Sequence, residues 1–415
     1  MSYLETEIAV VGGGPAGLFA AISAAKNGSV THLFESKSCI GKYEHCAGLL
    51  SVDGLNRLGL SDLPPEMVQN CGIVGSRLFS PSGINITVQK SSTTAWVVDR
   101  SKFDQYLSRL AEEKGVVIHT NSRVTSIKRD NNRMKLTLGK KSPINSVTSP
   151  LLILAEGRFP HLNQQIGLPS PSYSKIVFTT QYIMSGVKNI DLKYVEVYQT
   201  PEFAPGFFAW IIPIGEDEAK VGLGSHSRPT GKYLQHFITK HPIAKHKLSS
   251  ASIEKHMSGA IPVGSFIRKT YTDNVMVVGD AAGQTKPTTG GGVILGGLAA
   301  IKAGEMAVEA LKTANYSARF LSNYEKSWKK EMRSNLTIMK LVRQYLNSLN
   351  EKEIERLFEL LSTHKRKEKI SKIGDVDNQK KIVFKLLLDL RFLPFVVKTG
   401  VKFLIKTKRK KVLLN

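Results

Sequence analysis

Gly12, Gly14 and Gly17 have the spacing of a G-x-G-x-x-G turn, and Glu35 follows at the end of the next apolar run. In such a turn the first glycine permits a tight backbone bend, the second lets a pyrophosphate approach, and the third lets helix and strand pack closely. The helix that begins there presents free N–H groups to phosphates. Glu35 is placed to bind a ribose. These residues predict a dinucleotide site, and the alternative is an ordinary glycine-rich turn in a nucleotide-free α/β domain.

A second group of residues repeats this arrangement near position 280. Asp280 follows the apolar run 274–278, and three glycines at 290–292 precede a smooth helical pattern over 293–311. Ligands of open α/β sheets bind at the carboxyl ends of the strands, which makes Asp280 a candidate binding residue. The alternative role for Asp280 is a helix N-cap. We therefore expect two strand-to-helix turns to meet at one ligand.

Short apolar strands and helices must position these residues. β-branched apolar runs of four to five residues are typical of buried parallel strands, and apolar residues at helical spacing indicate helices that pack on them. The expected strands and helices of this kind are 8–11, 18–26, 30–34, 100–114, 151–154 and 274–278. They predict a doubly wound α/β unit that the chain leaves and rejoins.

Residues 175–224 have a different pattern, with strands separated by turns such as 215–217. This pattern predicts an antiparallel sheet with one polar and one apolar face, set on the nucleotide-binding unit as a second domain. The predicted fold class is α/β, with a discontinuous Rossmann-type domain, an inserted antiparallel-sheet substrate domain and a helical C-terminal region. The predicted divisions are 1–71, 96–165 and 266–312 for the first, 72–95 and 166–265 for the second, and 313–415 for the third.

The composition limits the class of protein. The 415 residues carry a net charge of +24, which favours an anionic partner or reflects a lysine-rich solvated surface. Cys39, Cys46 and Cys71 form no C-x-x-C pair, so neither a disulfide framework nor a metal site is expected. We also expect no signal peptide and no spanning helix, hence a cytoplasmic protein.

The C-terminal stretch carries lysines at helical spacing on an otherwise apolar background. Lys381 and Lys385 are followed by Pro394 and then by Lys398 and Lys402. This pattern predicts an interfacial helix that lies on an anionic membrane surface, at the inner face of the cell membrane. The alternative is a helix that packs on the body or on a second subunit. The charge is not accompanied by the aromatic–basic interleaving typical of nucleic-acid binding, so no nucleic-acid partner is expected.

The motifs together resemble FAD enzymes of the hydroxylase-like flavoprotein superfamily. The resemblance rests on the G-x-G-x-x-G turn with Glu35, on the run from Asp99 to Leu107, and on the sequence GDAA at 279–282. More narrowly, HCAG at 45–48 and PGFFAWIIP at 205–213 resemble the geranylgeranyl reductase family. The family pattern P-x-x-Y-x-W-x-F-P is departed from at Phe208 and Ile212. The resemblance covers about residues 1–330.

The resemblance implies roles for individual residues. Asp280 would hold the ribityl chain of FAD, and the dipole at the glycines would stabilise the anionic reduced flavin. Cys46 is the candidate proton donor, and Phe208 and Trp210 are candidate substrate contacts, although Phe208 lacks the hydroxyl of the family's tyrosine. Glu156 is expected to have no catalytic role. The residues expected to contact FAD are Gly12, Gly14, Ala16, Gly17, Glu35, Cys46, Ala47, Gly48, Leu49, Arg100, Val124, Asp280, Gly291, Gly292 and Val293.

The function that the resemblance implies is reduction of C=C bonds in the geranylgeranyl chains of isoprenoid lipids. Hydride would come from N5 of reduced FAD, and the reductant would be NAD(P)H or a ferredoxin. An unactivated alkene offers nothing to polarise, so catalysis would depend on positioning and a dry pocket. Two alternatives remain at this point: an FAD-dependent monooxygenase or halogenase, and a membrane-associated flavoprotein that carries electrons.

Overall fold

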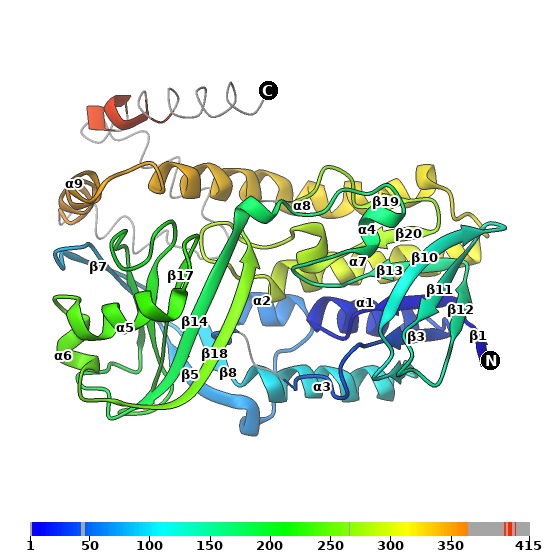
Figure 1. The fold of residues 1–415 in the computed structure, drawn as a ribbon, viewed down its shortest axis with the longest axis horizontal. Helices are drawn as coiled ribbons and strands as arrows, with labels where there is room; N and C mark the ends of the chain where they lie inside the picture. The colour runs from blue at the N-terminus through cyan, green and yellow to red at the C-terminus, as the bar shows by residue number, and fades with distance from the viewer. Residues whose placement is uncertain are drawn as a thin grey trace.

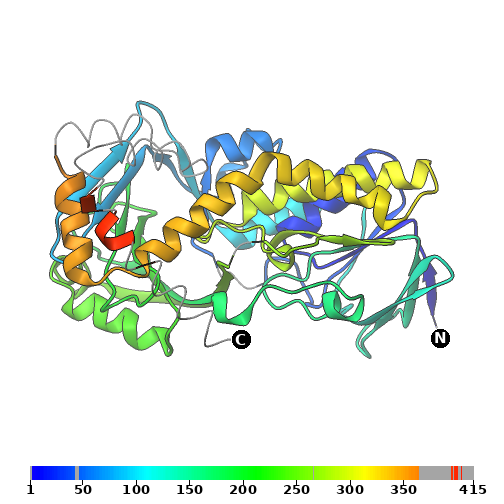
Figure 2. The same ribbon diagram turned by 90° about the horizontal axis from the view of Figure 1, so that it is seen from above.

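The computed structural model describes residues 2–42, 46–264, 266–363, 394–395, 397–400 and 403. Figures 1 and 2 show an elongated molecule with the N-terminus at one end and α9 (Glu351–Leu361) at the other. His45 lies outside the described residues, as does the predicted C-terminal surface helix except for the few residues given above.

The nucleotide-binding motif lies on a six-stranded sheet. Its strands, in spatial order, are β19 (Tyr271–Thr272), β20 (Val275–Val277), β13 (Leu151–Leu154), β2 (Ile8–Val11), β3 (Thr31–Phe34) and β9 (Val117–His119). All neighbours pair in parallel except β19 and β20. β20 pairs with β13, so the prediction that the chain returns to the N-terminal sheet near residue 275 is confirmed.

Three long helices pack beside this sheet. α1 (Pro15–Lys26) lies against both α3 (Arg100–Glu113) and α7 (Val293–Lys312). α1 and α7 approach so closely that a Cβ on Gly304 would lie 2.6 Å from the Ala20 carbonyl oxygen. The Ser23 hydroxyl also donates to the Ile301 carbonyl at 2.9 Å. Small residues on both helices therefore fix the two strand-to-helix turns relative to each other.

A four-stranded sheet covers part of the same sheet. It consists of β1 (Tyr3–Glu5), β12 (Ser146–Ser149), β11 (Arg133–Leu138) and β10 (Val124–Asp130). Its buried residues, such as Leu136 and Val147, share one hydrophobic cluster with Ala9, Leu152 and Val277 of the six-stranded sheet. This packing places the start of β10 near the nucleotide-binding turn.

The second large unit is a seven-stranded sheet. Its order is β18 (Ser252–Pro262), β14 (Ile176–Ser185), β17 (Ala219–Ser225), β16 (Ala209–Pro213), β15 (Tyr194–Tyr198), β6 (Gly75–Phe79) and β7 (Asn85–Gln89). Neighbours are antiparallel except β15 and β6, which are parallel.

The prediction of one polar face for this sheet is wrong. Every residue of β16 and β17 is buried. One face packs against α5 (Thr230–Lys240) and α6 (Ala244–Leu248), two helices that the sequence analysis did not predict. The opposite face carries aromatic residues into a cavity. A sheet covered on both sides has no solvated face to alternate with.

Several short strands and helices, together with two helices near the C-terminus, connect the six-stranded sheet to the seven-stranded sheet. β4 (Leu49–Ser51), β8 (Ala95–Val98) and β5 (Val68–Ile73) form a small sheet. The short helices are α2 (Val52–Arg57), α4 (Leu162–Gln165), η1 (Pro65–Met67), η2 (Tyr173–Lys175) and η3 (Gly279–Ala282). The Ser51 hydroxyl caps the start of α2 by accepting from Gly54 N–H.

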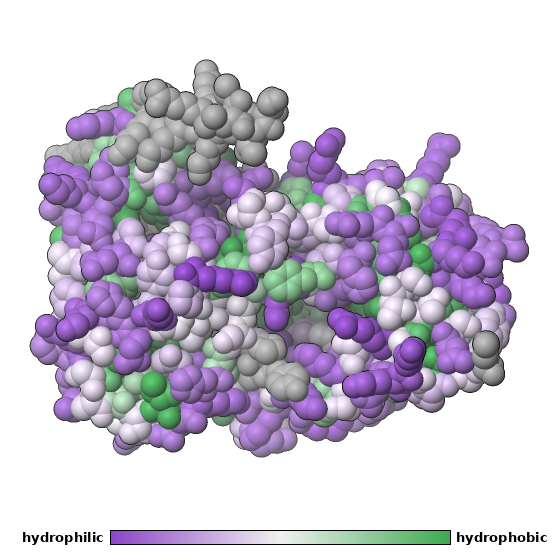
Figure 3. Space-filling view, viewed as in Figure 1, coloured by the Kyte–Doolittle hydropathy of each residue, from purple (hydrophilic) through white to green (hydrophobic). Residues whose placement is uncertain are grey.

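α8 (Ala318–Leu346) runs along the molecule from the six-stranded sheet toward the seven-stranded sheet, and α9 follows it (Figures 1 and 2). Its buried stripe includes Leu321, Tyr324, Trp328 and Leu336. None of the helices in the described part of the chain combines the length and apolarity that crossing a bilayer requires. On the face in Figure 3, hydrophilic residues dominate and hydrophobic ones form small separate areas.

Candidate functional site

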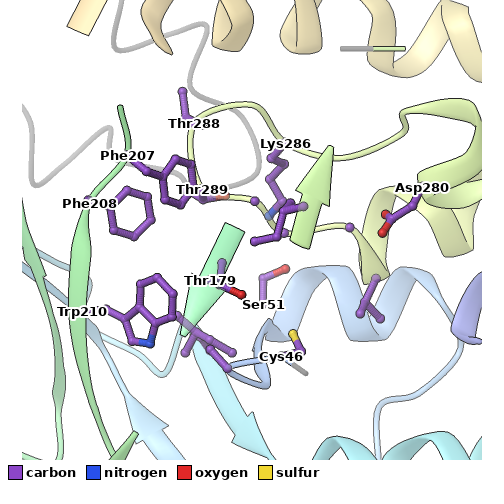
Figure 4. A pocket seen from close by; sticks show the side chains of 18 of the residues that line it. Cys46, Ser51, Thr179, Phe207, Phe208, Trp210, Asp280, Lys286, Thr288 and Thr289 are labelled. Carbon is purple, nitrogen blue, oxygen red and sulfur yellow. The ribbon is translucent and has the colours of Figure 1, made fainter. Parts of the chain in front are cut away.

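A cavity of about 2250 Å³ extends between the six-stranded and seven-stranded sheets, with α8 and α9 at one end. Glu35 and Gly14 line one end, and Leu357 and Phe358 of α9 line the other. Figure 4 shows its middle, where Phe207, Phe208 and Trp210 stand on one side, Asp280 on the other, and Lys286 and Thr289 between them. Its volume and extent accommodate two ligands, one at each end.

The glycine-rich turn has one position open to the cavity and two closed by backbone. Gly12 has φ of +108°, and a Cβ there would lie 2.3 Å from the Ala155 carbonyl oxygen. A Cβ on Gly17 would lie 1.9 Å from the Gly12 carbonyl oxygen. A Cβ on Gly14 would meet nothing within 4 Å, and Gly14 lines the cavity with Ala16. Gly14 therefore leaves the space that a pyrophosphate needs.

Glu35 is held at the end of β3 by its neighbours. One carboxylate oxygen accepts from Gly13 N–H at 2.7 Å, and the other accepts from Lys37 N–H at 2.8 Å. The side chain is almost fully buried and lines the cavity. Two backbone donors thus fix the carboxylate next to the turn, in the cavity wall, and its role toward a ribose stays a prediction.

Asp280 follows β20 in the cavity wall, where it is partly buried. Its Oδ1 accepts from the Thr285 hydroxyl at 2.9 Å. Burial raises the pKa of Asp280, and the Thr285 hydrogen bond and the charges of Arg158 and Arg100 only partly offset this effect. Asp280 lies inside η3 and not at the N-cap of a long helix, so the capping alternative does not account for it.

The glycines at 290–292 form a loop that ends at the N-terminus of α7. Gly291, Gly292 and Val293 line the cavity. A Cβ on Gly292 would lie 2.9 Å from Asp280 Oδ1, so a larger residue would displace that carboxylate. No side chain caps α7, which leaves its first N–H groups directed toward the cavity end. This loop and the Gly14 turn are the two strand-to-helix turns that the sequence predicted to meet.

Arg100 and Cys46 meet in the wall of the cavity. The Arg100 guanidinium lies 2.9 Å from Asp104 Oδ1, and both residues line the cavity. Burial disfavours the charged guanidinium, but the Asp104 carboxylate and the Cys46 side chain outweigh burial and raise the pKa of Arg100. Cys46 is a free, partly buried cysteine whose Sγ accepts from Gly48 N–H at 3.5 Å. Figure 4 shows Cys46 and Ser51 below Lys286.

The remaining predicted cofactor residues separate into two groups. Ala47, Leu49 and Val124 line the cavity. Gly48, like Gly17, is not among the lining residues: its φ is +76°, and a Cβ would lie 2.0 Å from the Val98 carbonyl oxygen. Close backbone packing explains why glycine is required at positions 17 and 48, and the contact of these two residues with FAD stays a prediction.

The aromatic side of the cavity comes from β16 and the residues before it. The rings of Phe207 and Phe208 stack with centroids 4.2 Å apart. The Trp210 indole N–H donates to Gln181 Oε1 at 2.9 Å, which fixes the ring orientation. All four side chains are buried and line the cavity. The predicted substrate residues Phe208 and Trp210 therefore face the same space as the predicted FAD residues.

The sequence analysis missed two buried cations in the cavity wall, Lys286 and Arg343. Arg343 donates from Nε to the Pro287 carbonyl at 3.3 Å and from Nη2 to the Thr288 carbonyl. Its guanidinium carbon lies 4.5 Å from the centre of the Phe207 ring. Burial lowers the pKa of Arg343 to about 10, so it stays charged at neutral pH. Arg343 continues the buried apolar stripe of residues 321–339 at helical spacing, and a charged residue in that position was the sequence feature that could have revealed it.

Glu156 lines the cavity and holds the start of α4. Its Oε2 accepts from Leu162 N–H at 3.0 Å at the start of α4, and Oε1 lies 2.8 Å from His161 Nδ1. Burial raises the pKa of Glu156, while His161 and the backbone donors lower it. The described residues contain no cluster of three or more His, Cys, Asp or Glu side chains that could hold a metal ion.

Comparison with known proteins decides the family. A family model described as an FAD binding domain matches residues 5–327. Digeranylgeranylglycerophospholipid reductase of Methanocaldococcus jannaschii is 34% identical over 358 residues, which are 86% of this chain and 90% of that protein. The chain belongs to the geranylgeranyl reductase family. This geranylgeranyl reductase homologue is therefore an FAD-dependent oxidoreductase, and the predicted family, enzyme class and cofactor are confirmed.

Solved structures agree with this assignment. A geranylgeranyl bacteriochlorophyll reductase-like protein from Thermoplasma acidophilum superposes with a TM-score of 0.85 at 25% identity, covering 97% of this chain and 100% of that chain. A flavin-dependent brominase superposes with a TM-score of 0.71 at 19% identity, over 92% of this chain and 97% of its own. The brominase shares the fold, and the predicted α/β fold class is confirmed.

Proposed function

We propose that this family member hydrogenates C=C bonds in the geranylgeranyl chains of isoprenoid glycerophospholipids. One observation carries the proposal: a single cavity joins the FAD-binding turns to a long apolar space. We call its far part the aliphatic end, and its lining residues are Leu78, Ile86, Val88, Leu346, Leu357 and Phe358. A prenyl chain needs a long, dry, apolar binding site of this kind.

The residues at the other end fit FAD on structural grounds. Gly14 leaves open space beside a helix N-terminus for the pyrophosphate, and buried Glu35 stands where a ribose would bind. Asp280 and the loop at 290–292 would hold the ribityl chain and the flavin ring. Reduced FAD supplies a hydride from its N5 when it is bound here.

The chain's own residues would position the alkene and exclude water. An isolated C=C bond carries no charge or hydrogen-bonding group, so orientation must come from shape. Phe207, Phe208 and Trp210 would press the prenyl chain toward the flavin, and Gln181 keeps Trp210 in one orientation. The stacked rings also keep this part of the cavity apolar, which suits a reactive hydride.

Cys46 is our candidate for the second hydrogen. One alkene carbon accepts the hydride, and the other needs a proton, which the Cys46 thiol would give up and later regain from solvent. The neighbouring Arg100 guanidinium would stabilise the thiolate left behind, because it already hydrogen-bonds the Cys46 side chain. The reductant is NAD(P)H or a ferredoxin, and the net charge of +24 favours such acidic partners.

We also propose that the protein works from the cytoplasm on the inner face of the cell membrane. Leu341 lines the cavity and is about half exposed, so the cavity reaches the surface beside α8. An opening with an apolar rim on a strongly basic chain would let a lipid pass from an anionic bilayer.

The test is anaerobic hydrogenation. Purified FAD-loaded protein is incubated with dithionite and a digeranylgeranyl glycerophospholipid in detergent, and mass spectrometry follows the addition of two hydrogens per double bond. We expect mass gain with the unchanged chain and almost none with Trp210→Ala, which should keep its FAD. A reduced, FAD-loaded protein that leaves the lipid unchanged would exclude the proposal, and oxygen-dependent halogenation would favour the other class.

Cys46→Ala tests the proton donor in the same assay. We expect at least a tenfold loss of turnover with FAD retained, since general acids contribute factors of about 100 or more. Full turnover would remove Cys46 from this role without affecting the rest of the proposal.

A further inference from the structure

Arg343 is a buried arginine near the end of α8, where it is only 4% exposed and lines the cavity. Its guanidinium lies beside two rings of the aromatic wall, with Cζ 4.5 Å from the centre of the Phe207 ring and 5.5 Å from that of the Phe208 ring. Leu346, three residues later on the same helix, belongs to the aliphatic end. Arg343 therefore lies where the aromatic side of the cavity meets the aliphatic end.

Two contacts with the protein hold the Arg343 guanidinium and leave one of its nitrogens unused. Nε and Nη2 donate to the Pro287 and Thr288 carbonyls, whereas Nη1 is buried and donates to none of the described residues. Arg343 forms no ion pair with a carboxylate of the described ranges, and burial alone lowers its pKa. A buried cation without a counter-ion is unfavourable, and each unused donor adds to that cost.

A second polar group without a partner belongs to the same region. Thr288 is 7% exposed and lines the cavity, and its hydroxyl is buried without a hydrogen bond to the part of the chain that the structure describes. The carbonyl of this residue is the one that accepts from Arg343 Nη2. Figure 4 shows the Thr288 and Lys286 side chains on opposite sides of their loop. Arg343 and Thr288 thus form a small polar area apart from the groups that we assign to FAD.

An unused guanidinium nitrogen and an unused hydroxyl suit an oxyanion. Guanidinium groups bind phosphate oxygens through charge-assisted hydrogen bonds, and a phosphate supplies the negative charge that this buried arginine lacks. We propose that Arg343 and Thr288 bind the phosphate group of the lipid substrate, from which the prenyl chains run past Phe207 into the aliphatic end. The inference deepens the proposed function and rests on it, because it takes the ligand of the aliphatic end to be a prenyl lipid.

A phosphate that carries a hydrocarbon chain fits this region better than a free phosphate ion. Phe207 and Leu346, which line the cavity on either side of Arg343, are apolar. Hydrocarbon attached to the phosphate would cover them, whereas a free ion would leave them facing water. The pyrophosphate of FAD is assigned to the Gly14 turn, at the other end of the cavity. The polar area should therefore favour a phosphate lipid over the same lipid without its phosphate.

The test compares ligand binding to the full FAD-loaded chain by equilibrium dialysis in detergent. Digeranylgeranylglyceryl phosphate and digeranylgeranylglycerol differ only in the phosphate, and inorganic phosphate is the third ligand. We expect the phosphate lipid to bind at least tenfold more tightly than the neutral lipid, and inorganic phosphate to bind much more weakly than the phosphate lipid. Arg343→Met should remove this preference and leave the affinity for the neutral lipid unchanged. Arg333→Met, at an exposed position of the same helix, should keep the preference.

Thr288→Val is a second variant, needed because Arg343→Met also removes the hydrogen bonds to the loop. It keeps the carbonyl that Arg343 binds and the size of the side chain, and it should weaken binding of the phosphate lipid alone, by about three- to tenfold. An unchanged preference in both variants, or equal weakening of both lipids, overturns the proposal. Inorganic phosphate that binds as tightly as the phosphate lipid overturns it as well.

Dialysis requires no turnover, so this result is separate from the test of the proposed function. A preference for the phosphate lipid that depends on Arg343, in a protein that does not hydrogenate that lipid with dithionite, would support the phosphate site and count against the proposed reaction alone.

Discussion

The two ends of the cavity are built in different ways. The end at the glycine turns consists of closely packed backbone, where a Cβ on Gly12 or Gly17 would lie 2.3 or 1.9 Å from a carbonyl oxygen. The aliphatic end consists of side chains from strands and helices far apart in the sequence, such as Ile86 and Leu357. The first end should therefore be intolerant of added atoms, whereas the second should respond to side-chain volume and orientation. Four predictions follow from this difference.

The largest effect should come from Gly17→Ala. Its Cβ would lie 1.9 Å from the Gly12 carbonyl oxygen, so the turn and α1 must move apart. We expect the free energy of unfolding to fall by on the order of 3 kcal/mol or more, and FAD binding to be lost. Urea denaturation and FAD fluorescence measure both quantities.

Gly14→Ala is the matched control for that change. Its Cβ would meet no protein atom within 4 Å, so the free energy of unfolding should hardly change. FAD affinity should still fall, because the methyl group occupies the approach of the pyrophosphate. A Gly14→Ala protein that binds FAD normally would contradict our assignment of the turn.

Arg343→Met tests the contact between the two ends. Arg343 bonds the loop at 287–288 and stacks on Phe207, so its removal leaves two buried carbonyls without donors. We expect a loss of about 2–3 kcal/mol in the free energy of unfolding of the FAD-free protein. Arg333→Met, at an exposed position of the same helix, should cost less than ~0.5 kcal/mol. Equal effects would show that the buried contacts contribute little.

Asp280→Asn separates cofactor binding from folding. Because burial raises the pKa of folded Asp280 above that of the unfolded chain, the native protein binds the proton more tightly. The stability of the FAD-free protein should therefore fall as pH rises from the unfolded pKa through the folded one. Asp280→Asn has no carboxyl group to titrate, so its stability does not fall in this way as pH rises. At neutral pH it should be more stable than the unchanged chain, and in strong acid the two proteins should be equally stable.

The same variant should bind FAD about 10–100-fold more weakly, because a hydrogen bond that the cofactor donates to the carboxylate is lost. Calorimetric unfolding between acid and neutral pH and an FAD titration give the two results. Lower stability of Asp280→Asn at neutral pH would contradict the sign of the argument.

Gln181→Leu should have the smallest effect and should be confined to the substrate side. It removes the acceptor for the Trp210 N–H in a buried site. We expect kcat/KM for lipid reduction to fall about tenfold, the equivalent of one lost hydrogen bond, with FAD affinity unchanged. Gln235→Leu, exposed on α5, serves as control. A loss of FAD affinity in Gln181→Leu would contradict the separation of the two ends.

The sequence predicted the two strand-to-helix turns that line the cavity, because glycine spacing acts locally. A G-x-G-x-x-G turn, an acid after a strand, and a second glycine cluster before a helix require few distant contacts to be recognised. The polar face predicted for the second sheet was wrong because α5 and α6 cover it, and alternation along one strand does not reveal what packs on it. The proposed domain boundaries and the FAD contacts of single residues stay predictions.

By itself, then, the sequence determined which residues would form the turns, which aromatic run would face them, and which family the chain resembles. Only the tertiary structure decided that α8 and α9 close the aliphatic end, that Arg343 meets Phe207, and that Lys286 lies beside Gly291. The physical reason is how far apart along the chain the interacting residues lie. Backbone turns are set by neighbouring residues, whereas a cavity and its buried charges depend on how segments hundreds of residues apart pack together.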